Sequence, residues 1–136
     1  MPWAYTEHQC YAHDWLYLSG DPPRMLLAGA NGSPGFWDRP SRAEGFLMIS
    51  DDLGESWTQV TSLPDRMNWM AWALTPHPTD PDSAFAGMGD QSRGFGFTPG
   101  KGGSGAFYVT RDRGETWEAI ISDLPTVFVI RAVPTD

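Results

Sequence analysis

An eight-residue pattern occurs twice in the chain and constrains the fold more than any other feature. It reads SDDLGESW from position 50 and TRDRGETW from position 110, so both copies fit Ser/Thr-x-Asp-x-Gly-Glu-Ser/Thr-Trp. The two octets begin 60 residues apart in a chain of 136 residues. Self-similarity at a fixed spacing indicates a repeat architecture, in which each repeat is one supersecondary unit.

Each octet is embedded in a series of four short apolar runs separated by turn-rich segments. The runs lie at 15–18, 25–29, 46–49 and 57–60 in the first unit, and at 69–74, 84–87, 106–109 and 117–120 in the second. The second run of each unit ends in Ala-Gly, at Ala28-Gly29 and Ala86-Gly87, and we match these dipeptides in the repeat. The first three runs are apolar on both faces, whereas the fourth alternates. Each unit is therefore predicted to form a four-stranded antiparallel sheet whose fourth strand is an edge strand with one wet face.

The octet falls between the third and fourth strands, where a hairpin turn is required. The carboxylate of Asp52 can accept hydrogen bonds from backbone N–H groups of the turn. Gly54 supplies a positive φ that other residues resist. The hydroxyl of Ser50 can tie the turn, and Trp57 can fill the wedge between adjacent sheets with apolar area. In the second octet the same roles fall to Thr110, Asp112, Gly114 and Trp117.

Both octets resemble the Asp-box, or bacterial neuraminidase repeat, at every defining position. The resemblance implies an all-β protein: a β-propeller fragment with two four-stranded antiparallel blades and the first strand of a third. It also implies that the octets are structural turns away from any active site. Asp-boxes occur in sialidases, xyloglucan-cleaving glycosidases, sortilin-like receptors and photosystem assembly factors, so the resemblance alone does not fix the function.

The predicted blades occupy residues 14–64 and 65–125. Residues 126–136 are expected to form the first strand of a further blade, and residues 1–13 an N-terminal segment or a displaced strand. Propellers close with about four to eight blades, so two blades leave apolar faces that need neighbours. These neighbours would come from a longer chain or from homo-oligomerisation. A longer chain is favoured because the sequence ends within a blade.

The topology predicts a ligand site at the end of the sheets opposite the octets. Because consecutive antiparallel strands reverse direction, the loops 30–45 and 87–105 and the connection 64–69 should emerge there together. Both loops exceed the usual hairpin lengths, and long loops on a rigid scaffold often carry binding residues.

These segments hold side chains suited to carbohydrate. Aromatic rings can stack on a sugar, and guanidinium groups can clamp a carboxylate. The candidate binding residues are Trp37, Arg39, Arg42, Arg66, Trp69, Arg93 and Phe95. The candidate acids and bases are Asp38, Glu44 and Asp90. The alternative is that these residues only order the loops, with aromatics as anchors and Arg–Asp pairs at the surface.

Two functions from different classes fit these residues. The first is a non-catalytic propeller module that binds carbohydrate or protein through the long loops. The alternative is a fragment of a sialidase-like or xyloglucanase-like glycoside hydrolase that uses loop carboxylates. The resembling sialidases carry an Arg-Ile-Pro motif, and the nearest string here, Ile130-Arg131-Ala132, departs from it. This departure favours the binding module, for which no cofactor is expected.

Composition and charge limit the kinds of partner and compartment that are expected. A formal net charge of −8 argues against nucleic acid. No membrane span is expected, because no run reaches 18 apolar residues. The first residues lack the regions of a signal peptide, and the lone Cys10 gives no compartment. His8, His13 and Asp14 could form a metal set, but their spacing favours ordinary hydrogen bonding, so no metal is predicted.

Overall fold

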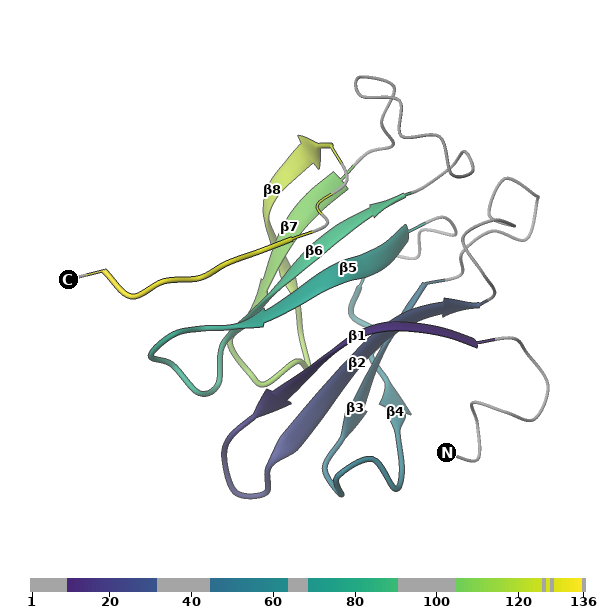
Figure 1. Ribbon diagram of the computed structural model, residues 1–136, viewed down its shortest axis with the longest axis vertical. Coiled ribbons are helices and arrows are strands. Elements are labelled where there is room, and N and C mark those ends of the chain that lie inside the picture. Colours follow the sequence, from purple (N-terminus) through teal and green to yellow (C-terminus); the bar gives the residue numbers. More distant parts are fainter. Residues whose placement is uncertain are drawn as a thin grey trace.

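The chain folds into two four-stranded antiparallel sheets (Figure 1). The computed structural model describes residues 10–31, 45–63, 69–90, 105–125, 127 and 129–135. Sheet A has the strand order β1-β2-β3-β4, and sheet B has the order β5-β6-β7-β8. The strands are β1 (Cys10–Leu18), β2 (Arg24–Asn31), β3 (Phe46–Ser50), β4 (Thr58–Gln59), β5 (Trp69–Pro76), β6 (Ala84–Asp90), β7 (Gly105–Thr110) and β8 (Glu118–Leu124). The prediction of an all-β chain with two four-stranded sheets is confirmed, and the described part has no helix able to span a membrane.

Every strand runs antiparallel to the next, so the connections within the sheets alternate between two ends. The β1–β2, β3–β4, β5–β6 and β7–β8 turns share one end, at the lower left of Figure 1, which we call the octet end. The opposite end, the loop end, carries the last residues of β2 and β6 and the first residues of β3, β5 and β7. The octets therefore lie at the end opposite the strand ends that flank residues 32–44 and 91–104, as the alternation of strand direction predicts.

The fourth strands differ from the expected edge strand with one wet face. β4 has only two residues, and both are exposed. β8 is longer, but it is exposed along nearly its whole length, including Ile120 and Ile121 at about half their full exposure. In the first unit the run still ends in a buried residue, because Val60 directly after β4 donates its N–H to the Leu47 carbonyl at 2.8 Å and lies in the core. In the second unit Trp117, directly before β8, is buried in the core, whereas β8 itself has no buried residue.

The registers of the two sheets correct the sequence match between the repeats. Met25 pairs with Ser50 in sheet A, and Ala84 pairs with Thr110 in sheet B. Since Ser50 and Thr110 open the two octets, Met25 and Ala84 are equivalent. The two Ala-Gly dipeptides are then shifted by one residue relative to each other, so matching them is wrong. A shift of one residue turns each side chain to the opposite face of its strand.

One buried cluster fills the space between the sheets. From β2 and β3 of sheet A it takes Leu26, Ala28, Leu47 and Ile49. From β6 and β7 of sheet B it takes Ala84, Ala86, Met88, Ala106 and Tyr108. Because of the register shift, these two sets are not equivalent positions. The equivalents of the sheet A set lie on the outer face of sheet B, so the two sheets stack head to tail, with unlike faces in contact.

The ends of the described chain differ from the predicted boundaries. β1 begins at Cys10, so the first sheet starts before residue 14. The expected strand at 126–136 is not assigned as a strand where it is described, at 127 and 129–135. These residues, which we call the tail, run along the outer face of sheet B (Figure 1). There the Val127 N–H faces the Met88 carbonyl at 3.4 Å, and the Thr75 hydroxyl donates to the Ile130 carbonyl at 3.0 Å.

Candidate functional site

Most of the predicted ligand-binding residues lie outside the described residues. These are Trp37, Asp38, Arg39, Arg42, Glu44, Arg66, Arg93 and Phe95. The backbones of the remaining two, Trp69 and Asp90, are described, and the residues are directly opposite each other in the β5–β6 ladder at the loop end. Two candidates that are 21 positions apart in the sequence (90 − 69) are thus brought together by the register of sheet B.

An aromatic cluster lies near the same end, and the sequence analysis did not identify it. His13 stacks on Tyr11 with ring centroids 5.6 Å apart, and it meets Trp72 edge-on at 4.9 Å. Nδ1 of His13 lies 3.3 Å from the Tyr11 hydroxyl. Trp72 is buried and donates its indole N–H to the Gly89 carbonyl at 3.2 Å, whereas His13 is exposed. We call Tyr11, His13 and Trp72 the aromatic cluster.

The aromatic cluster is created by two β-bulges at equivalent places. The β1–β2 register shifts between Ala12 and Asp14, and the β5–β6 register shifts between Ala71 and Ala73. The extra residues are therefore His13 and Trp72. Bulges re-aim side chains and are common next to binding sites. No sequence signal indicated this cluster, because a bulge leaves no mark in a single sequence.

The weak metal candidates have other roles where they are described. The Asp14 carboxylate accepts the Leu74 N–H of β5 at 2.8 Å, so it links the first strands of the two sheets. His13 belongs to the aromatic cluster, and His8 lies outside the described residues. Among the described side chains, no group of three His, Cys, Asp or Glu is arranged to hold a metal ion.

The first octet forms a closed hairpin turn centred on one carboxylate. Asp52 accepts the Ser56 N–H at 2.9 Å, the Ser56 hydroxyl and, at 2.7 Å, the Ser50 hydroxyl. The Gly54 N–H donates to the Ser50 oxygen at 2.8 Å. The Trp57 indole donates to the Gly54 carbonyl at 3.0 Å, which fixes its ring over the turn. Bonds from Ser56 and then Ser50 lower the pKa of Asp52 to about 2.

The second octet repeats this arrangement bond for bond. Asp112 accepts the Thr116 N–H at 2.9 Å and the Thr110 hydroxyl at 2.8 Å. The Trp117 indole N–H donates to the Gly114 carbonyl at 2.9 Å. Burial raises the pKa of Asp112, but the bonds from Thr116 and Thr110 outweigh it, so the pKa lies below its ordinary value.

Both octets also place two successive residues in left-handed conformations. These are Leu53 with Gly54, at φ 59° and 92°, and Arg113 with Gly114, at φ 60° and 91°. Only the glycines were expected to adopt a positive φ. A non-glycine residue with a positive φ is uncommon, so its recurrence at Leu53 and Arg113 marks the two turns as the same structure.

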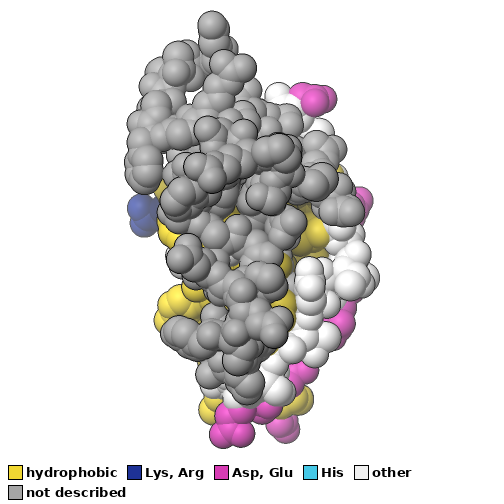
Figure 2. Space-filling model, turned by 90° about the vertical axis from the view of Figure 1, so that its right-hand side faces the viewer, with side chains coloured by type: hydrophobic (Ala, Val, Ile, Leu, Met, Phe, Trp, Pro, Cys, Tyr) yellow, Lys and Arg dark blue, Asp and Glu magenta, His cyan; other side chains and the backbone are white. Residues whose placement is uncertain are grey.

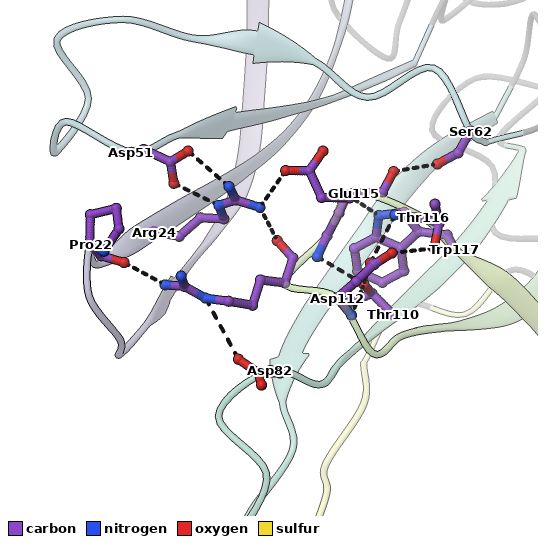
Figure 3. A network of polar contacts seen from close by, with 12 residues as sticks. Pro22, Arg24, Asp51, Ser62, Asp82, Thr110, Asp112, Glu115, Thr116 and Trp117 are labelled. Carbon is purple, nitrogen blue, oxygen red and sulfur yellow. Dashed lines mark hydrogen bonds and ion pairs between the residues drawn. The ribbon is translucent and has the colours of Figure 1, made fainter.

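One arginine joins the two octets across the sheets (Figure 3). Arg24, at the start of β2, binds the Asp51 carboxylate with two N–H groups at 2.6 and 2.8 Å. Its third nitrogen donates to Glu115 at 2.8 Å and to the Arg113 carbonyl at 3.1 Å. Its hydrogen bond with Asp51 raises the pKa of Arg24 and lowers that of Asp51. Nothing local in the sequence distinguished Arg24, because its partners lie 27, 89 and 91 positions away.

The second octet is anchored further by its own arginine. Arg113 donates to the Pro22 carbonyl at 2.7 Å in the β1–β2 turn, and its Nε lies 3.9 Å from an Asp82 oxygen in the β5–β6 turn. This Nε is buried without a hydrogen-bond partner. The Ser62 hydroxyl donates to the Glu115 carbonyl at 2.9 Å. The octet end is therefore a set of turns linked to one another (Figure 3).

A pocket of about 260 Å³ at the octet end has no free carboxylate. It is lined by Ile49, Asp51, Asp52, Ser56, Thr58 and Glu115. Asp51 and Glu115 already bind Arg24, and Asp52 is used within its turn. Acidic side chains gather at the lower edge of the molecule in Figure 2. In the pocket itself, the carboxylate oxygens are engaged in holding the turns.

Comparison with known proteins gives no further assignment. No family model, no curated protein and no solved structure matches the chain. Its function must therefore be inferred from its own residues and geometry.

Proposed function

We propose that the two sheets are adjacent blades of an Asp-box β-propeller, and that the chain is a non-catalytic module that binds carbohydrate at the loop end. The observation that carries the proposal is the identity of the two octets, which repeat the same hydrogen bonds and the same pair of left-handed residues. The head-to-tail stacking of the two sheets also supports the blade assignment, because blades stacked around an axis present unlike faces to each other.

The polar side chains of the octet end are used to hold turns together, and this supports a ligand site at the other end of the sheets. At the octet end the carboxylates and arginines hold turns to turns, with Arg24 as the central cation. At the loop end, His13 is exposed beside the ends of β2 and β6, and the half-buried Tyr11 stacks on it. Aromatic rings with a hydrogen-bonding edge suit sugars, which combine apolar C–H faces with hydroxyl groups.

Isothermal titration calorimetry with 3′-sialyllactose and with a xyloglucan heptasaccharide tests the proposal. We expect one of these probes to bind and His13→Ala to weaken that binding about tenfold, which corresponds to ~1.4 kcal/mol. Arg111→Gln is the matched control, because its exposed ion pair with Glu118 lies at the octet end. Absence of binding to both probes, or an equal loss in the control, would contradict the proposal.

Hydrolysis of model substrates distinguishes the glycoside hydrolase alternative from the binding module. Fluorogenic sialoside and β-glucoside substrates should release no product if the chain only binds. Release that disappears in Asp90→Asn, Asp38→Asn or Glu44→Gln would instead favour an enzyme with an acid and a base.

A further inference from the structure

The turn between β5 and β6 is closed by one histidine ring. Nδ1 of His77 accepts the Asp80 N–H at 3.0 Å and the Thr79 N–H at 3.3 Å. At the base of the turn, the His77 N–H donates to the Ser83 carbonyl at 2.9 Å. In a neutral imidazole the nitrogen that accepts hydrogen bonds carries no proton, so the ring proton of His77 lies on Nε2.

Protonation of this ring removes the acceptor on which the turn closes. Both nitrogens of an imidazolium are donors, so a protonated Nδ1 faces two N–H groups that point at it. His77 is half-buried, and its ring packs against Phe85 with the centroids 5.7 Å apart. The closed form of the turn therefore requires a neutral His77.

The surrounding charges do not replace the lost acceptor. The charged side chains on the elements around His77 are Asp80 and Asp82 of the same turn, Arg113 of the second octet and Arg131 of the tail. The Asp80 carboxylate attracts a protonated His77, but it accepts the Ser83 hydroxyl at 2.6 Å and the Asp82 N–H at 3.0 Å. This attraction offsets part of the loss and supplies no acceptor for the two N–H groups that Nδ1 releases.

The β1–β2 turn has the same length and closes without a histidine. The partners of the equivalent residues Met25 and Ala84 are directly followed by Leu18 and His77, which therefore correspond. Leu18 is buried and carries no titratable group. Both turns contain Asp-Pro at the same place, at 21–22 and 80–81. The histidine is thus a feature of the second repeat and is not needed to build a turn of this length.

The β5–β6 turn supports the second octet. The Asp82 carbonyl accepts the Arg113 N–H at 2.8 Å, and an Asp82 carboxylate oxygen lies 3.9 Å from Arg113 Nε. The Arg113 carbonyl in turn accepts a hydrogen bond from Arg24, the residue that links the two sheets. We propose that His77 makes this turn a pH switch, whose protonation opens the turn and loosens the second octet.

Urea unfolding at two pH values tests the switch. A histidine in an unfolded chain takes up its proton near pH ~6.5. Because the closed turn requires the neutral ring, the unfolded state binds this proton first, so the stabilisation is present above pH ~7 and is lost as the pH falls. From pH 7.5 to pH 5.5, the equilibrium constant for unfolding should rise by up to about tenfold more in the wild type than in His77→Asn. The asparagine oxygen accepts the same two N–H groups and does not titrate.

The matched control is His13→Asn. Nδ1 of His13 lies 3.3 Å from the Tyr11 hydroxyl, which can accept as well as donate a hydrogen bond, so His13 meets a partner in either protonation state. This variant should keep the pH dependence of the wild type. Equal pH dependence in the wild type and in His77→Asn, or an equal loss of it in His13→Asn, would overturn the proposal.

Nitrogen-15 NMR of the wild type tests the same switch without any variant. At pH 7.5 we expect Nδ1 of His77 to be unprotonated and Nε2 to carry the proton. The amide signals of Thr79, Asp80 and Arg113 should then shift together as the pH falls to 5.5. A protonated Nδ1 at pH 7.5, or an Arg113 amide that does not follow the other two, would contradict the coupling of the turn to the second octet.

Discussion

At the scale of single residues, the two octet glycines differ only in their surroundings. A Cβ at Gly54 would lie 3.4 Å from the Trp57 ring, whereas one at Gly114 would lie 2.7 Å from Leu26. Both alanine variants carry the strain of a positive φ, about 1–3 kcal/mol. Only Gly114→Ala also crowds the core, by about a further 1–3 kcal/mol. Urea unfolding should therefore give a clearly larger loss for Gly114→Ala, and equal losses would argue against the docking of the second octet on sheet A.

Protonation of a single carboxylate, at the centre of the first octet, should make the stability of the fold depend on pH. Hydrogen bonds from Ser56 and Ser50 lower the pKa of Asp52 to about 2, against about 3.9 in an unfolded chain. The unfolded state therefore binds the proton first, so the stabilisation is complete above pH ~4 and is lost as the pH falls towards ~2. The stability difference between wild type and Asp52→Asn should shrink across this interval. A difference that stays constant from pH 5 to pH 2, in urea unfolding at each pH, would contradict this linkage.

At the scale of the elements, Arg24 is the polar link between the sheets. Its side chain is 12 % exposed, whereas Asp51 and Glu115 are 44 % and 59 % exposed. Arg24→Gln should destabilise the fold by about 1–3 kcal/mol, because it leaves the Arg113 carbonyl and two carboxylates without their donor. Arg111→Gln, which breaks an exposed pair with Glu118, should cost about 0–1 kcal/mol. Similar midpoints for the two variants in thermal unfolding would show that Arg24 is no more than a surface charge.

The strands of each sheet were predictable because their apolar runs and turn residues are local signals. The register between the repeats was not predictable from the sequence. The sequence suggests that the two Ala-Gly dipeptides are equivalent, whereas the strand pairing offsets them by one residue. That shift decides which face of β6 meets sheet A, and it is fixed by pairing with the octet-bearing β7.

The candidate site was predictable as a place and much less so as a set of residues. Alternating strand direction is enough to put the long loops opposite the octets. The aromatic cluster depends on bulges at His13 and Trp72, and the link through Arg24 joins residues as much as 91 positions apart. Such contacts arise only when the two sheets meet, so no periodicity records them.

At the scale of the whole molecule, the two sheets share one core and should unfold together. Leu26 of sheet A is fully buried and lies beneath Gly114 of the second octet. Leu26→Ala should cost about 2–5 kcal/mol, and native-state hydrogen exchange should accelerate equally in β2 and in β6 and β7. Ile120→Ala, on the exposed β8, should change stability by no more than about 0.5 kcal/mol. If exchange in β6 and β7 kept its wild-type rate, sheet B would be stable without sheet A. The head-to-tail core would then be a contact between two independently stable sheets, whereas a common acceleration means that neither sheet keeps its structure without the other.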